Sequence, residues 1–138
     1  FAMSEALTII LKRNDPSAVA KQVSLTELGS IKINKEERGK MLKAIPRNSV
    51  IGFLIGVLPG AGATIASFLA YGMERNFVSD EEKEKFGKGS VHGLTAPETA
   101  NNAACSGAFV PLLTLGIPGS GTTAVMLGAL LGFGIQPG

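Results

Sequence analysis

The sequence has few of the residues from which catalytic and metal sites are usually built. It contains one cysteine, Cys105, and one histidine, His92. One cysteine cannot form an internal disulfide, and with a single histidine it makes no ligand cluster for a metal. Cys105 lies among alanines and glycines, where a thiol behaves as a small hydrophobic side chain. The apolar stretches also lack a paired nucleophile and base, so we expect neither an enzyme nor a cofactor.

Charge is missing from two long stretches of the chain. Residues 48–73 and 99–138 contain no Asp, Glu, Lys or Arg, and all 24 charged residues lie in residues 1–47 and 74–98. An uncharged run of 40 residues is atypical of a soluble domain of this size. A membrane crossing needs about 20 apolar residues. The pattern predicts an all-α membrane protein, a polytopic helical bundle.

The charge distribution divides the chain into three parts. We expect residues 1–11 to end an upstream membrane helix, residues 12–47 to form a basic cytoplasmic linker, and residues 48–138 to form a transmembrane transport core with a polar loop at 74–94. The linker holds nine basic and four acidic residues, and basic residues beside spans favour the cytoplasmic face. It contains no aromatic residue, which argues against a nucleic-acid-binding tail. Because the chain begins at Phe1, we expect it to be an internal piece of a longer protein.

Both uncharged stretches are interrupted by a Pro-Gly sequence. The first break is LPGAGAT at residues 58–64, and the second is GIPGSGTT at residues 116–123. Irregular backbone at membrane depth is tolerated only where protein buries it or where it lines a watery cavity. Paired interrupted segments point to the binding site of a transporter. We therefore expect Pro-Gly-interrupted or re-entrant helices, and for residues 49–72 we favour a hairpin over one kinked span.

Capping residues and glycine patterns predict the other helices. Four helix starts are predicted from Ser, Thr or Asn ahead of acidic residues, and these are Ser24, Asn34, Ser79 and Thr95. Residues 95–117 should form an apolar helix kinked at Pro111, and residues 122–135 should form another. Two GxxxG patterns, Gly52–Gly56 and Gly128–Gly132, predict close contacts between helices.

The candidate substrate-binding residues lie at the two breaks and on the helix between them. A helix that starts inside the membrane points free N–H groups and a partial positive charge outward, which makes an anion site without Lys or Arg. Hydroxyls add donors, and two adjacent amides in an uncharged helix are costly to bury without partners. The candidates are Gly60, Gly62, Thr64, Asn101, Asn102, Gly119, Ser120 and Thr122. The alternatives are that the hydroxyls cap helices and that the asparagines join helices.

Three further residues bear on ion coupling. Glu98 is a candidate because an ionisable residue in a membrane helix is functional by default, with helix capping as the alternative. Thr123 is a second candidate, since hydroxyl and carbonyl oxygens suit Na⁺. His92 is expected to be a solvated loop residue, although its imidazole could titrate near neutral pH. The sequence does not decide between Na⁺ and H⁺.

Several motifs resemble the TctA family, the large permease subunits of tripartite tricarboxylate transporters. The motifs are GVLPGAGATIASFLAY at residues 56–71, FGKG at 86–89, APETANNA at 96–103, LGIPGS at 115–120 and GAL at 128–130. The resemblance covers nearly the whole chain, although residues 12–47 match only loosely. One position differs, because the family usually has Glu where this chain has His92. If that Glu takes part in ion coupling, the coupling in this chain is in doubt.

The resemblance implies a multi-pass permease of the bacterial inner membrane. Such a permease works with a periplasmic solute-binding protein and a small membrane subunit, and it imports citrate-like or other carboxylates with an ion gradient. The alternative is a non-transporting membrane scaffold or assembly subunit, in which the glycines serve only packing. No motif identifies the carboxylate.

Overall fold

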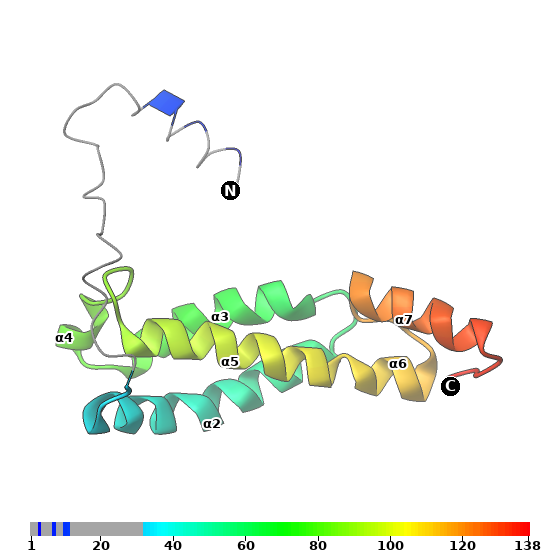
Figure 1. Cartoon of the computed structure of the whole chain (residues 1–138), viewed down its shortest axis with the longest axis horizontal. Coiled ribbons are helices and arrows are strands. Elements are labelled where there is room, and N and C mark those ends of the chain that lie inside the picture. Colours follow the sequence, from blue (N-terminus) through cyan, green and yellow to red (C-terminus); the bar gives the residue numbers. More distant parts are fainter. Residues whose placement is uncertain (1–2, 4–6, 8–9, 12–31) are drawn as a thin grey trace. The chain divides into compact units, whose positions relative to one another are not determined.

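The computed structural model describes residues 32–138 together with Met3, Leu7, Ile10 and Leu11. The predicted capping box at Ser24, and most of residues 1–11, lie outside these residues. Residues 34–138 form one compact unit. Its elements are α2 (Lys35–Val57), α3 (Gly62–Phe77), α4 (Asp80–Lys83), α5 (Val91–Gly107), α6 (Phe109–Leu115) and α7 (Gly121–Gly132) (Figure 1). No strand occurs in residues 32–138, so the all-α part of the prediction is confirmed.

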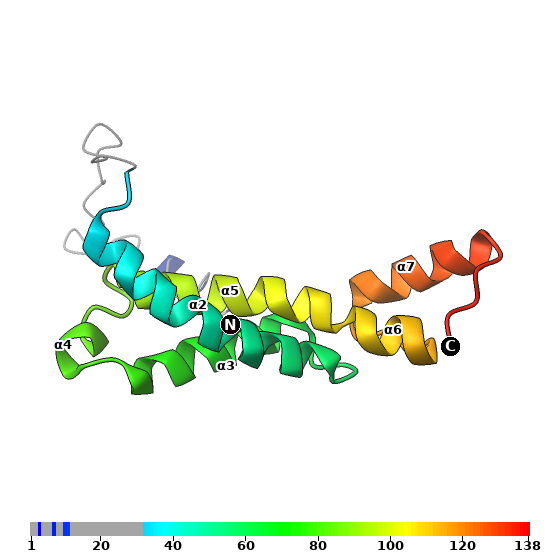
Figure 2. The ribbon, with the colours of Figure 1, turned by 90° about the horizontal axis from the view of Figure 1, so that it is seen from below.

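The helices α2 and α3 form an antiparallel hairpin around the first Pro-Gly break. They lie side by side and α5 packs against both, most extensively against α2 (Figures 1 and 2). The hairpin favoured for residues 49–72 is therefore confirmed. Because α2 begins at Lys35, the boundary predicted between residues 47 and 48 falls inside one continuous helix. Across residues 32–138, no helix is at once long and apolar enough to cross a membrane.

The core is built from alanine and glycine. Ala66 and Ala70 of α3 pack with Ala100 and Ala104 of α5. Glycines of α2 let its backbone touch α5, because a Cβ on Gly52 would lie 2.5 Å from the Ala100 Cα and one on Gly56 would lie 2.6 Å from the Ala104 Cα. The first GxxxG prediction is thus confirmed. The second has no such contact here, since a Cβ on Gly128 or Gly132 would meet no atom within 4 Å among the described residues.

Of two further predicted helix starts, one agrees with the structure in full and the other in part. Asn34 forms a complete capping box with Glu37, as expected at the start of α2. Ser79 does precede α4, but its side chain accepts no capping hydrogen bond. The acidic residues after it are instead paired with lysines, as in the contact of 2.8 Å between Lys83 Nζ and Asp80 Oδ1.

The predicted start at Thr95 is wrong. The helix α5 begins four residues earlier, where the Ser90 hydroxyl accepts from the N–H of Gly93 at 3.0 Å. Thr95 and Pro97 therefore lie inside the helix, and Glu98 is an exposed mid-helix residue with no capping role. Proline lacks an N–H and is favoured in the first turn of a helix, but α5 accommodates Pro97 in its interior.

The second half of the unit follows the predicted breaks more closely. Ala108 separates α5 from α6. Pro111 follows three residues later, and because it has no N–H it cannot bond to the carbonyl of Gly107. Gly116 then ends α6 in the left-handed conformation, with φ of 65°. The last helix, α7, ends at Gly132, three residues earlier than the predicted end.

We expect Gly56→Ala to destabilise the protein, because the added methyl collides with the backbone of α5. Overpacking of this kind costs about 1–3 kcal/mol. The matched control is Gly72→Ala, since Gly72 lies in α3 with nothing within 4 Å of its Cβ position, and alanine favours a helix over glycine by about 0.5–1 kcal/mol. Thermal unfolding of the full-length protein in detergent measures both. Equal midpoints for the two variants would contradict the close approach.

Candidate functional site

The two Pro-Gly breaks, 59 residues apart in sequence at Gly60 and Gly119, meet in the folded unit. The N–H of Gly60, in the turn between α2 and α3, donates to the carbonyl of Gly119, in the turn between α6 and α7, at 3.1 Å. Gly60 and Gly62 have φ of 84° and 67°, in the left-handed region that side chains other than glycine rarely adopt. The turn before α3 therefore depends on these two glycines.

A cavity of about 270 Å³ lies beside this contact, and we call it the tip cavity. Residues of the first turns of α3 and α7 and of the end of α5 line it. Five predicted site residues line it, namely Gly62, Thr64, Ser120, Thr122 and Thr123. Cys105, Phe109 and Met126 add an apolar wall, and no Lys or Arg is among the lining residues.

The hydroxyls of the tip cavity divide into two kinds. Ser120 and Thr123 form a reciprocal capping box, in which the Thr123 N–H donates to Ser120 Oγ at 3.2 Å and the Ser120 N–H donates to Thr123 Oγ1 at 2.8 Å. These two hydroxyls therefore hold the first turn of α7, as the capping alternative predicts. Thr64 and Thr122 are exposed and make no side-chain hydrogen bond within the described residues, which leaves their hydroxyls available.

The start of α3 also has free donors. Its N-cap residue is Ala61, which supplies no side-chain cap. The first N–H groups of a helix have no partner inside the helix, and here Gly62 and Thr64 line the tip cavity. The positive ends of α3 and α7 thus lie at one cavity.

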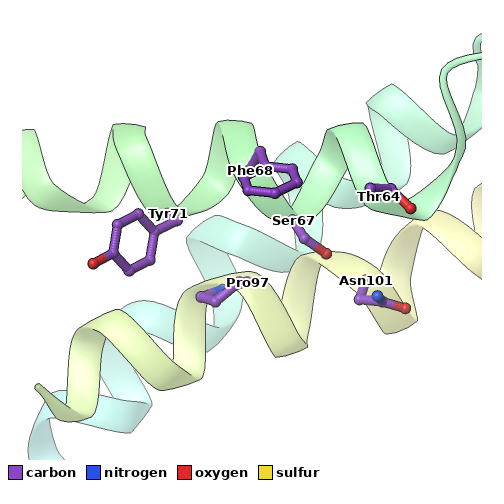
Figure 3. A pocket seen from close by; sticks show the side chains of 6 residues that line it. All are labelled: Thr64, Ser67, Phe68, Tyr71, Pro97 and Asn101. Carbon is purple, nitrogen blue, oxygen red and sulfur yellow. The ribbon is translucent and has the colours of Figure 1, made fainter. Parts of the chain in front are cut away.

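A second cavity, of about 410 Å³, runs between α3 and α5 (Figure 3). Thr64 lines both cavities, so the two adjoin. Figure 3 shows Thr64 and Asn101 toward one end, with Phe68 and Tyr71 further along α3. Of the two predicted asparagines, Asn101 lines this cavity.

Asn102 lines neither of these two cavities. Its side chain is exposed, and its Nδ2 donates to the carbonyl of Glu98 in the same helix at 2.8 Å. Glu98 is also exposed and lines neither cavity. Asn101 is exposed as well.

A buried polar cluster that no sequence pattern predicts lies at the other end of the hairpin. Glu74 is fully buried, and its carboxylate accepts from Arg47 Nε at 3.0 Å, from Asn48 Nδ2 at 2.8 Å and lies 2.7 Å from His92 Nδ1. The Arg47 guanidinium also lies over the ring of Phe77, 4.5 Å from its centre. We call Arg47, Asn48, Glu74 and His92 the Glu74 cluster. His92 is buried in the first turn of α5, so the prediction of a solvated loop histidine is wrong.

Electrostatics favour an ionised carboxylate in this cluster. Glu74 follows the uncharged run 48–73 and begins the polar segment. Burial by itself raises the pKa of Glu74, but hydrogen bonds from Arg47, Asn48 and His92 outweigh it and hold the pKa below its ordinary value. The cluster joins α2, α3 and α5 through one side chain. Within the described residues, no group of three or more His, Cys, Asp or Glu side chains could hold a metal.

These features define an all-helical protein in which two glycine turns enclose a small cavity lined with hydroxyls. The whole chain, residues 1–138, matches the family described as "Tripartite tricarboxylate transporter TctA family". The chain therefore belongs to the TctA family, which is a family of transporter components and not of enzymes.

Two relatives from Agrobacterium vitis are similar to this chain. The "Uncharacterized 52.8 kDa protein in TAR-I ttuC' 3'region" is 37% identical over 126 residues, which cover 91% of this chain and 25% of the relative. The "Uncharacterized protein in TAR-II ttuC' 3'region" is 47% identical over 87 residues, which cover 63% of this chain and 35% of the relative. The chain thus spans about a quarter to a third of these relatives. No solved structure matches it significantly.

We expect Arg47→Gln to destabilise the protein strongly, because it leaves the buried carboxylate of Glu74 without its cationic partner. Removing one member of a buried ion pair costs about 3–5 kcal/mol. The double variant Arg47→Gln/Glu74→Gln should regain part of the lost stability, since it no longer contains an uncompensated buried charge.

The control for this prediction is Lys83→Gln, which breaks a pair whose Asp80 side chain is 97% exposed. Exposed pairs contribute little to stability, because water screens their charges. Thermal unfolding of the three variants and the wild type makes the comparison. An Arg47→Gln midpoint as high as that of Lys83→Gln would contradict a stabilising Glu74 cluster.

Proposed function

We propose that the chain forms part of a permease that imports tricarboxylates or related carboxylates across the bacterial inner membrane. A periplasmic solute-binding protein delivers the substrate, a small membrane subunit completes the complex, and a gradient of Na⁺ or H⁺ drives uptake. Membership of the TctA family supports a tricarboxylate transporter component. The substrate, the two partner subunits and the driving ion are part of this proposal.

The observation that carries the proposal is the meeting of the two Pro-Gly turns at the tip cavity. It gives one cavity the starts of α3 and α7, whose N–H groups favour an anion. The hydroxyls of Thr64 and Thr122 supply further donors for a carboxylate, and Asn101 lies in the adjoining cavity. Interrupted helices whose starts face a substrate are a recurring way to bind anions in carriers.

The surface of the unit supports a membrane location. Large apolar side chains are exposed on every long helix, among them Leu54 of α2, Phe68 of α3, Leu94 of α5 and Val125 of α7. Exposed apolar surface on this scale is unusual for a soluble monomer. Lipid and the other helices of a larger permease would cover it.

We expect Thr64→Val and Thr122→Val to weaken carboxylate uptake, because valine keeps the shape of threonine and removes the hydroxyl donor. A hydrogen bond to a charged group contributes about 1.5–3 kcal/mol, so KM should rise at least about tenfold for each variant. Uptake of labelled citrate and related acids by cells with the complete permease system, at matched membrane expression, is the measurement.

The matched control is Thr114→Val on α6, whose exposed hydroxyl donates to the carbonyl of Val110 and lines neither cavity. Its KM should equal that of the wild type. An unchanged KM in both test variants would move the site away from the tip cavity. If the wild-type system takes up none of the acids, the scaffold interpretation replaces transport.

A further inference from the structure

The tip cavity is separated from the charged end of the unit by most of the length of α3. All charged side chains of the unit except Glu98 lie in residues 34–47 and 74–88, and the hairpin brings these two segments to the same end (Figure 1). Gly62 begins α3 at the tip cavity, and Glu74 follows twelve residues later, which is about 18 Å at the rise of an α-helix. A substrate held at the tip cavity has to pass along this length to reach the charged end.

Two further cavities lie between the tip cavity and the charged end. The first is the cavity of about 410 Å³ between α3 and α5, which shares Thr64 with the tip cavity. A third cavity, of about 380 Å³, shares Tyr71 with the second. Its other lining residues belong to residues 87–94, in the turn before α5 and the first turn of that helix. Each cavity thus adjoins the next through one side chain of α3.

The lining residues follow the same order along both helices. On α3 they run from Gly62 through Ser67 to Tyr71. On α5, which runs in the opposite direction (Figure 1), they run from Cys105 through Asn101 to residues 93 and 94. The eleven residues from 94 to 105 span about 17 Å. Since both helices give the same order, the cavities lie in a row, and we call them together the α3–α5 groove.

We propose that the carboxylate moves between the tip cavity and the charged end through the α3–α5 groove, and that Tyr71 is the gate of this route. The inference rests on the proposed function. It adds to that function a path for the substrate and a residue that controls passage along it.

The chemistry of the groove suits an anion in transit. No Asp, Glu, Lys or Arg is among the described residues that line it. A fixed cation would hold a carboxylate and a fixed anion would repel it, whereas neutral donors stabilise it without trapping it. Thr64 and Asn101 are such donors, because their side chains make no hydrogen bond with the described residues.

The exposure of Asn101 is further support for a route that contains water. Its amide is exposed on a helix of the uncharged run 99–138. An unpartnered amide is costly to place against an apolar environment. Irregular or polar groups at membrane depth are tolerated where they line a watery cavity. A water-filled groove along α5 therefore accounts for an exposed amide at this position.

Tyr71 stands where the second and third cavities meet. Its ring contacts the ring of Phe86 edge to face, with 5.1 Å between the centroids and 66° between the planes. Phe86 in turn lies against α5, since a Cβ built on Gly93 would lie 3.3 Å from Phe86 Cδ1. Figure 3 shows the Tyr71 hydroxyl pointing away from Thr64 and Asn101. The Tyr71 ring, held by Phe86, therefore stands between the part of the groove that holds the free donors and the charged end.

The turn that holds Phe86 has the freedom that a gate requires. Gly87 and Gly89 follow Phe86 and line the third cavity, with φ of 76° and 102°, which residues other than glycine rarely adopt. A Cβ at either position would meet no atom within 4 Å among the described residues. A shift of this open turn would carry Phe86 away from the Tyr71 ring, and rotation of the released ring would join the second cavity to the third.

The test measures how fast an anionic methanethiosulfonate, which does not cross membranes, modifies introduced cysteines in vesicles that contain the complete permease system. Ser67→Cys lies in the second cavity. Leu69→Cys is the control of matched depth, because Leu69 lies about 200° around α3 from Ser67 and lines none of the three cavities. The modified position is identified by mass spectrometry.

We expect Ser67→Cys to react at least about tenfold faster than Leu69→Cys, because only a thiolate reacts and a thiol away from water stays protonated. Citrate, or the related acid that the wild type takes up, should slow the reaction. Adding Tyr71→Ala to the Ser67→Cys protein should raise the rate about tenfold further when the reagent is on the side of the charged end, as for a barrier lowered by about 1.4 kcal/mol. Adding Phe133→Ala instead, which removes an exposed ring outside the groove, should leave the rate unchanged.

Three results would overturn the inference while uptake by the wild type continues. They are equal rates at Ser67→Cys and Leu69→Cys, a rate that the transported acid does not slow, and equal effects of Tyr71→Ala and Phe133→Ala. If Ser67→Cys fails to fold, judged by gel filtration, Asn101→Cys replaces it on the facing helix. A wild type that takes up none of the acids would overturn the proposed function itself, and the inference with it.

Discussion

The close approach of α2 and α5 is the constraint on which the rest of the structure depends. At Gly52 and Gly56 the backbone of α2 touches that of α5, which no residue with a Cβ would permit. The same contact places Gly107 against the end of α2. A Cβ built on Gly107 would lie 3.0 Å from the backbone nitrogen of Val57. Since α5 ends there, the turn after α6 is brought to the turn after α2. The meeting of the two Pro-Gly turns is therefore a consequence of the helix packing.

A core made of alanine and glycine gives close contact but little apolar area. Dispersion between small side chains and backbone stabilises such a core, while the area removed from water is modest. The Glu74 cluster contributes what the core lacks, because a buried carboxylate with directional partners on α2 and α5 fixes the register of these helices. The two ends of the hairpin therefore fix different aspects of the helix packing. Packing without side chains sets the distance at one end, and charged hydrogen bonds set the register at the other.

Local sequence signals predict most of the helices and breaks, but they do not predict which residues of different helices are in contact. Asn34 was identified as a cap because its partner lies three residues away, and the Pro-Gly breaks were visible as interruptions of uncharged runs. The capping pattern at Thr95 predicts a start for α5 that is too late, because the single hydroxyl of Ser90 is a weaker signal in the sequence. Glu74 and His92 meet only because α3 and α5 pack in one register, and no spacing in the sequence encodes that register. That the two breaks share a cavity was expected from their pairing, but which hydroxyls are free was not.

The tip cavity has donors and no fixed cation, and this difference bears on how a carrier works. A lysine or arginine in the cavity would hold a carboxylate through a desolvated ion pair, and a polyanionic substrate held in this way would leave slowly. Backbone N–H groups and hydroxyls offer weaker, distributed stabilisation. If a carboxylate binds there, as we propose, small movements of α3 against α7 would separate the donors and lower the affinity. The glycines of the two turns permit such movements without a change in any side chain, so one cavity can both accept and release its substrate.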